Sequence, residues 1–183
     1  MADTEEKSPA EEAEVKAPEK VYFYDSAGSY WPDEPLDKLW VMLYGDGRYA
    51  SPQHEAADFH EARWITVLGS SNCGAADFEP GNAVYSDRLR SWAEARRAGG
   101  YRARVYTDLS NLPWAWDLCA GLKNVVWWIA TLDGTERTAE ELVEFIKVEH
   151  KINVPITTKE IWGLQFEGGP NSAYDKSVLL GTW

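Results

Sequence analysis

Short, almost continuously apolar runs alternate with segments of helical periodicity along most of the chain. Runs of this kind, rich in Val, Ile, Trp and Tyr, are typical of strands that are buried on both faces. They predict strands at residues 21–25, 40–45, 64–69, 75–79, 104–108, 125–131 and 161–166. The alternation of buried strands with helices is typical of an α/β protein with a largely parallel sheet.

Three segments between these runs are predicted to be helical. Residues 86–99 have Ser86 as the expected N-cap and Gly99 after the last turn. Residues 138–150 open with a capping box, Thr138 with Glu141, followed by an apolar stripe. A shorter helix is expected at 111–121.

The segment between the third and fourth predicted strands is too short for a crossover helix. It consists of residues 70–74, Ser-Ser-Asn-Cys-Gly, whereas parallel neighbours normally need a dozen or more residues to reconnect. These two strands are therefore expected either to pair antiparallel or to continue one another through a bend. A barrel built from them is expected to be irregular or partly open.

Acidic residues stand at or just beyond the C-terminal ends of six predicted strands: Asp25, Asp46, Glu79, Asp108, Asp133 and Glu167. An open doubly wound sheet and a closed barrel both fit the strand pattern. No G-x-G-x-x-G motif follows the first strand, so the dinucleotide fingerprint of the open sheet is missing. In a (β/α) barrel the C-terminal strand ends converge on one mouth, where active sites form. Some of the six acids are expected to be turn or cap residues, but their convergence favours an irregular or truncated (β/α) TIM-like barrel.

The first twenty residues differ in composition from the rest. They hold seven acids, three lysines and almost no large apolar side chain, so they cannot bury enough surface to offset their ordering entropy. We expect a disordered acidic tail at 1–20 and one domain at 21–183. The N-terminus has no apolar segment of the kind that a signal peptide requires.

Charge and composition narrow the classes of partner. The chain carries 18 basic and 30 acidic residues, a net charge of −12, which disfavours nucleic acid and anionic membranes. The three histidines, His54, His60 and His150, have no ligand spacing such as i, i+4, so no zinc site is expected. No other metal and no cofactor are expected. The two cysteines, Cys73 and Cys119, are expected to be buried free thiols, although one disulfide is the alternative.

Several short stretches, in their order along the chain, resemble a known family. They are YFYDSAG, GAADFEPGN, ARVYTD, WWIATLDG, WGLQFEGG and YDKSVL. Together they resemble the muramidase-type lysozymes of glycoside hydrolase family 25, and more closely the short glycoside-hydrolase-like domains of actinobacteria and their bacteriophages. The resemblance covers roughly residues 21–183 and implies a domain that acts on or binds bacterial cell-wall glycan.

The resemblance also implies a set of site residues. It assigns the general acid to Glu79, with Asp77 assisting and with Asp25 and Asp175 completing the acidic mouth. Glycoside hydrolysis needs one protonated acid at the leaving oxygen and a second carboxylate near the sugar ring. Candidate sugar-binding side chains on or beside the strands are Tyr24, Tyr106, Trp128, Trp162 and Gln165, although core packing is the alternative for each aromatic ring.

Two further functional interpretations stay open. In one, the barrel is a non-catalytic structural or binding protein of a phage particle, attached to other virion proteins through the acidic tail. In the other, the domain is a structural interaction module that uses its tryptophans. Without a signal peptide, the protein is expected in the cytoplasm of the producing cell or in a phage particle.

Overall fold

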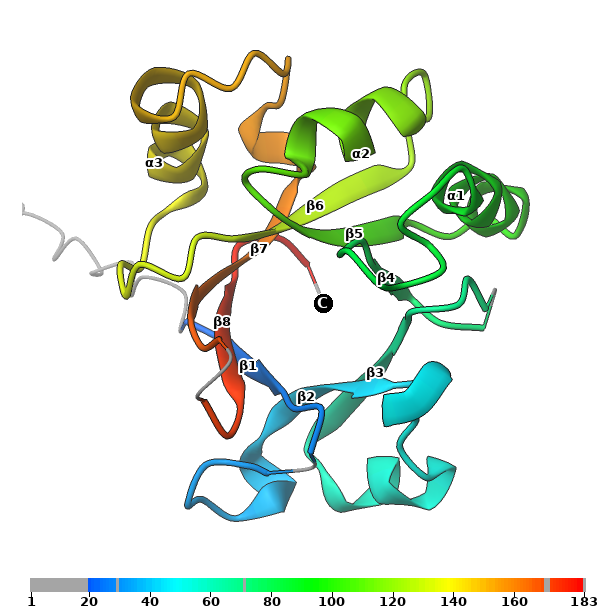
Figure 1. The fold of residues 1–183 in the computed structure, drawn as a ribbon. Helices are drawn as coiled ribbons and strands as arrows, with labels where there is room; N and C mark the ends of the chain where they lie inside the picture. The colour runs from blue at the N-terminus through cyan, green and yellow to red at the C-terminus, as the bar shows by residue number, and fades with distance from the viewer. Residues whose placement is uncertain (1–19, 29, 71, 170–171, 183) are drawn as a thin grey trace, which may run out of the picture.

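Eight strands in the described part of the chain close into one barrel in sequence order (Figure 1). The computed structural model describes residues 20–28, 30–70, 72–169 and 172–182; the tail predicted at 1–20 lies outside these residues except for Lys20. The strands are β1 (Tyr22–Asp25), β2 (Trp40–Tyr44), β3 (Glu61–Thr66), β4 (Ala75–Asp77), β5 (Ala103–Asp108), β6 (Val125–Ala130), β7 (Ile161–Glu167) and β8 (Asp175–Leu179). The barrel was expected to be irregular or partly open: it is closed, and its irregularity consists of register shifts where β7 pairs with β6 and β8.

Strands β1 to β7 pair parallel, in agreement with the largely parallel sheet that the sequence predicts, but β8 runs antiparallel to both of its neighbours, β7 and β1. Only residues 168–174 connect β7 to β8, which is too short for the crossover that a parallel pair normally needs. The reversal decides at which edge of the barrel β8 begins. The first residue of β8, Asp175, lies at the same barrel edge as the last residues of the parallel strands.

The pairing of β3 with β4 corrects the expectation for the short connection between them. The two strands are parallel, and Ile65 and Thr66 of β3 pair with Ala75 and Ala76 of β4. Residues 67–74 are long enough for this connection because β4 pairs only with the last two residues of β3. The chain therefore does not have to run back along the whole length of β3 before β4 begins. The Asp46 carboxylate holds the start of this connection, because it accepts hydrogen bonds from the backbone N–H groups of Val67 (2.8 Å) and Leu68 (3.1 Å).

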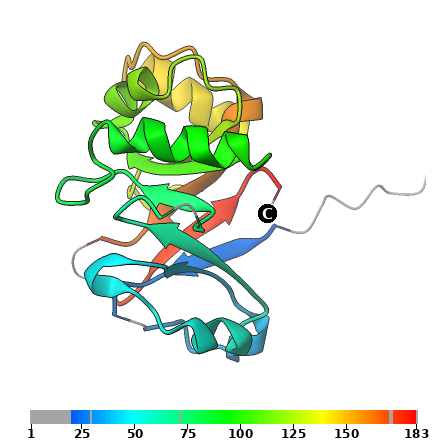
Figure 2. The same ribbon diagram turned by 90° about the vertical axis from the view of Figure 1, so that its right-hand side faces the viewer.

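Helices cover one flank of the barrel and 3-10 turns the other (Figures 1 and 2). The helices α1 (Arg88–Ala98), α2 (Leu112–Leu118) and α3 (Ala139–Glu144) follow β4, β5 and β6, and α3 continues as one π-helical stretch, Phe145–Glu149. Short 3-10 turns at Leu36–Lys38, Gly47–Tyr49 and Gln53–Asp58 take the place of helices around β1 to β3, and another at Thr158–Glu160 precedes β7. No helix among the described residues has the length and apolar character needed to cross a membrane.

The predicted helix starts are partly confirmed. Thr138 and Glu141 form the predicted capping box at α3, and Gly99 is the C-cap of α1. The N-cap prediction for α1 was wrong by one residue: the cap position is Asp87. The Ser86 hydroxyl still accepts a hydrogen bond from the backbone N–H of Arg88, at 3.3 Å. Cys73 and Cys119 are buried free thiols, as expected.

Large aromatic side chains fill the barrel interior. Trp128 packs against Phe23 and Tyr106 with ring centroids 5.0 Å and 4.7 Å apart, and its indole N–H donates to the Ser177 hydroxyl at 3.0 Å. Trp162, also buried, packs on Phe23 at 5.0 Å. The interior is therefore a packed core, so a ligand site is expected at an end of the barrel and not inside it.

Candidate functional site

Four acidic side chains gather at the barrel edge formed by the C-terminal ends of the parallel strands. Asp25 ends β1, Asp77 ends β4, Glu79 follows Asp77 by two residues, and Asp175 begins β8. Asp25 and Asp175 lie directly opposite one another in the β1–β8 ladder. Asp175, Asp77 and Glu79 all raise the pKa of Asp25, and Asp175 also raises the pKa of Asp77 and Glu79, so the four acids are electrostatically coupled. We call these four residues the acid cluster.

Asp25 and Asp77 are the most deeply buried members of the acid cluster, with 7% and 4% of their surface exposed. Burial is the main reason that the pKa of Asp25 lies well above its ordinary value, and Asp175 adds to the effect. Burial, followed by repulsion from Glu79, raises the pKa of Asp77 to about 8. The carboxyl group of Asp77 therefore favours the protonated form near neutral pH.

Glu79 lies just beyond the end of β4 and not on the strand, which was predicted to run to residue 79. The chain nevertheless stays close to β5, because the backbone N–H of Phe78 donates to the carbonyl of Tyr106 at 2.9 Å. Glu79 is partly exposed, and burial raises its pKa while a hydrogen bond with the Tyr106 side chain lowers it. Glu79 is thus the member of the Asp77–Glu79 pair that a ligand can reach.

Asp175 is fixed by the chain that precedes it. The backbone N–H of Gly169 donates to Asp175 Oδ1 at 2.9 Å, and a hydrogen bond with the Gln165 side chain also lowers the pKa of Asp175, although burial raises it overall. A Cβ atom on Gly168 would lie 2.0 Å from Asp175 Oδ1, and the φ angle of Gly168 is +139°. Both facts call for glycine at this position.

Three buried oxygen atoms at this edge accept no hydrogen bond from any described residue: Asp25 Oδ2, Asp77 Oδ1 and Gln165 Oε1. Buried polar atoms are normally paired, and an unpaired one in a native structure calls for an explanation. A bound ligand with hydrogen-bond donors is one such explanation. Among the described residues, no group of three His, Cys, Asp or Glu side chains is arranged to hold a metal ion.

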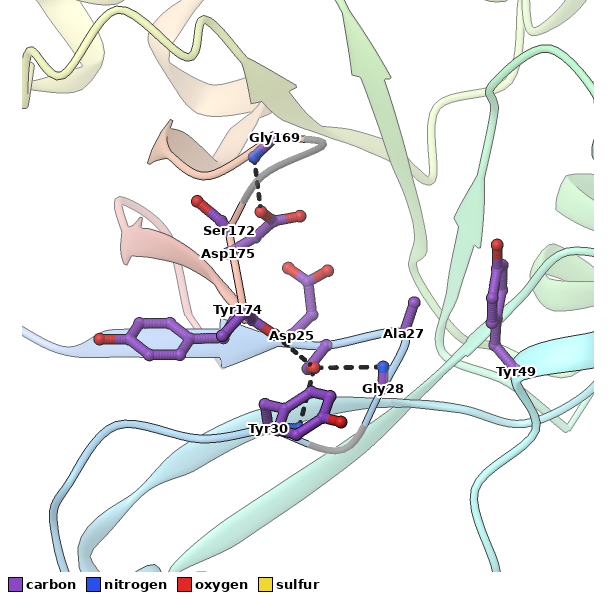
Figure 3. A pocket seen from close by; sticks show the side chains of 11 residues that line it. Asp25, Ala27, Gly28, Tyr30, Tyr49, Gly169, Ser172, Tyr174 and Asp175 are labelled. Carbon is purple, nitrogen blue, oxygen red and sulfur yellow. Dashed lines mark hydrogen bonds between the residues drawn. The ribbon is translucent and has the colours of Figure 1, made fainter.

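A cavity of about 570 Å³ opens beside Asp25 and Asp175 (Figure 3). Its walls include the aromatic residues Tyr30, Tyr49 and Tyr174. The Ser26 hydroxyl joins two of the wall segments, because it donates to the carbonyl of Ala173 at 2.8 Å and accepts from the backbone N–H of Tyr30 at 3.0 Å. The volume lies within the range of ordinary small-molecule sites, roughly 300–1,000 Å³.

The structure brings only some of the predicted sugar-binding residues to the acid cluster. Tyr106 and Gln165 lie with it. Trp128 and Trp162 are each 1% exposed and belong to the barrel interior. Tyr24 lies on the outer face of β1, where it packs against Tyr174 with ring centroids 5.6 Å apart.

The cavity's own aromatic walls were not predicted. Tyr30, Tyr49 and Tyr174 all lie outside the strands, so strand periodicity gives no signal for them. A signal is present for Tyr174, which directly precedes Asp175, and for Tyr30, which follows Asp25 by five residues. Proximity in sequence to a predicted site acid would have identified these two.

Three of the other acids at strand ends serve local structure, as expected for some of the six. Asp46 holds the β3–β4 connection. Asp108 accepts hydrogen bonds from the backbone and side chain of Asn111, at 2.8 Å and 2.9 Å. Asp133 forms an ion pair with Arg137 at 2.6 Å, which is the main reason that its pKa falls to about 2.

Comparisons with known proteins give a fold neighbour. No protein-family model and no curated protein matches the chain. The chain is similar to the crystal structure of an uncharacterized B. stearothermophilus protein, with a TM-score of 0.57 and 14% sequence identity over 87% of this chain and 95% of the other. At that identity the similarity concerns the fold alone.

Proposed function

We propose that this protein is a lysozyme-like glycoside hydrolase that acts on bacterial cell-wall glycan. The observation that carries the proposal is the Asp77–Glu79 pair: a buried carboxyl group and a partly exposed one, two residues apart, both with a raised pKa, at the mouth of a barrel. Two coupled carboxyl groups of unequal exposure supply the acid and the assisting group that glycosidic cleavage needs. The sequence resemblance to the family 25 muramidases supports the same assignment.

The barrel itself is proposed to be a shortened (β/α) barrel. Seven parallel strands in sequence order and helices after β4, β5 and β6 support this interpretation. The remaining crossovers are reduced to 3-10 turns, and the last strand is reversed. In such a barrel the acid cluster occupies the end at which active sites are built.

In the proposed mechanism Glu79 carries the proton for the leaving group, because burial raises its pKa and so favours its protonated form. Glu79 donates this proton to the glycosidic oxygen as the bond between that oxygen and the anomeric carbon breaks. Its partial exposure lets the leaving oxygen reach it, whereas Asp77 is only 4% exposed and assists by sharing protons and charge with Glu79. Water then adds to the anomeric carbon and its proton passes to a carboxylate of the cluster, which restores the starting state.

The test is release of soluble fragments from purified actinobacterial peptidoglycan by the wild type and by Glu79→Gln. Glu167→Gln is the matched control, because Glu167 is an exposed glutamate at the C-terminal end of β7. We expect release by the wild type and by the control, and none by Glu79→Gln with an unchanged melting temperature. Equal release by wild type and Glu79→Gln would overturn the assignment. No release by any of the folded proteins would favour the alternative, a non-catalytic phage virion protein.

A further inference from the structure

The cavity beside the acid cluster is lined, among the described residues, by acidic side chains and by no basic ones. Asp25 and Asp175 belong to its lining, and no Lys, Arg or His is among the described residues that form it. The nearby Arg48 lies over the ring of Tyr49, with its guanidinium carbon 4.5 Å from the ring centroid. No basic side chain of the cavity lining can therefore neutralise the two carboxylates.

Asp25 and Asp175 are also paired in an arrangement that an isolated sheet disfavours. They are direct cross-strand partners of the antiparallel β1–β8 ladder, and like charges directly opposite one another are destabilising. Figure 3 shows both carboxyl groups beside the cavity, with Asp175 held by the N–H of Gly169. A cation bound between them would convert the repulsion into attraction.

The hydrogen-bonding capacity of the site matches the same kind of ligand. Asp25 is 93% buried, and its Oδ2 atom accepts no hydrogen bond from a described residue. Gln165 does not itself line the cavity, but its side chain bonds to Asp175, and its buried Oε1 atom has no donor among the described residues. An ammonium group offers three N–H donors and no acceptor. It can therefore donate hydrogen bonds to unpaired oxygen atoms without bringing an acceptor that needs a donor of its own.

We infer that this cavity binds the free amino group of a hexosamine unit, so that the protein prefers glycans whose amino sugars lack the acetyl group. The inference rests on the proposed function for its ligand class, a cell-wall glycan, and adds a specificity to it. An N-acetylated sugar presents a neutral amide and a methyl group to the same carboxylates. The exposed ring of Tyr30 at the cavity wall offers an apolar surface for the sugar ring.

The test is calorimetric binding of two probes to the full chain, the tetrasaccharide of glucosamine and that of N-acetylglucosamine. We expect the glucosamine probe to bind at least about tenfold more tightly at ~150 mM salt, where long-range attraction to the acidic protein is largely screened. The preference is expected to disappear in Asp25→Asn and in Asp175→Asn. Asp37→Asn, which changes an acid outside the cavity lining, is expected to keep it.

Two results would overturn the inference. One is equal or tighter binding of the N-acetylated probe, which includes the case in which neither probe binds. The other is a preference that survives in both Asp25→Asn and Asp175→Asn; each variant is first shown to have a cooperative thermal transition, so that a misfolded one is recognised. The outcome is separable from the proposed function, because selective binding without fragment release rejects only the hydrolase, and release without selectivity rejects only the amine site.

Discussion

Replacing the buried Asp77 by asparagine is predicted to stabilise the protein at high pH, whereas most substitutions of buried side chains destabilise it. The carboxyl group of Asp77 is 4% exposed, and one of its oxygen atoms has no hydrogen-bond donor among the described residues. Burial and repulsion from Glu79 raise its pKa from 3.8 to about 8. The folded protein therefore holds the Asp77 proton more tightly than the unfolded chain does, and Asp77→Asn removes this dependence by making the group neutral at every pH.

The magnitude follows from the size of the pKa shift. Below pH 3.8 Asp77 is protonated in both the folded and the unfolded chain, so its ionisation does not reduce the free energy of unfolding. As the pH rises toward 8, the unfolded chain loses the proton more readily than the folded protein does, and the free energy of unfolding falls. About four pKa units at ~1.4 kcal/mol each correspond to a loss on the order of 5 kcal/mol. We expect Asp77→Asn to match the wild type near pH 4 and to unfold with a free energy several kcal/mol higher at pH 8.

The assay is urea unfolding followed by tryptophan fluorescence across this pH range. Asp133→Asn is the control with the opposite sign. The pKa of Asp133 is lowered to about 2, mainly by the hydrogen bond with Arg137, so Asp133 contributes stability above its unfolded pKa that is lost as the pH falls toward 2. Asp133→Asn is therefore expected to be less stable than the wild type at pH 8. A gain from Asp77→Asn that is the same at pH 4 and pH 8 would refute the reasoning.

Three further substitutions test the packing that positions the site. Gly168→Ala places a Cβ atom 2.0 Å from Asp175 Oδ1 at a φ of +139°, so it should lower the melting temperature at a cost of about 1–3 kcal/mol; an unchanged melting temperature would contradict the close approach. Asp46→Ala leaves the N–H groups of the β3–β4 connection without their acceptor and should cost ~1–3 kcal/mol and speed proteolysis within residues 67–74; wild-type resistance to protease would contradict this. Phe78→Ala removes a fully buried ring and should cost about 3–5 kcal/mol in chemical unfolding, whereas a loss below ~1 kcal/mol would show that the ring is not packed as described.

The parallel strands could be predicted because their residues are apolar on both faces. In β6, for example, all six residues are buried, and a run of this kind gives an unambiguous signal. The last strand gave no such signal, because β8 combines Asp175, Lys176 and Ser177 with only two apolar residues. Its inward Ser177 is buried against the Trp128 indole, a role that is visible only once the barrel is closed.

The acid cluster was predictable in part for a related reason. Asp25 and Asp77 end parallel strands, so convergence at one edge follows from topology. Asp175 begins a strand, and only the reversal of β8 brings it to the same edge. For this residue the family resemblance carried information that strand patterns lack.

The sugar-binding predictions overlooked the two-residue alternation along a strand. Because Asp25 faces the barrel mouth, its neighbour Tyr24 must face outward, where it packs with Tyr174. The aromatic residues that do line the cavity lie in loops and in the 3-10 turn Gly47–Tyr49, and the conformation of such segments depends on tertiary contacts such as those of the Ser26 hydroxyl. Residue type alone cannot place them.

The central claim is that Glu79 delivers a proton to a glycosidic bond. The most direct measurement is the quantity of soluble reducing sugar released from purified peptidoglycan by wild type, Glu79→Gln and Glu167→Gln at equal concentrations of folded protein. The proposed function predicts release by the wild type and by Glu167→Gln, with none above background for Glu79→Gln. Equal release by all three, or none by the wild type, would contradict it.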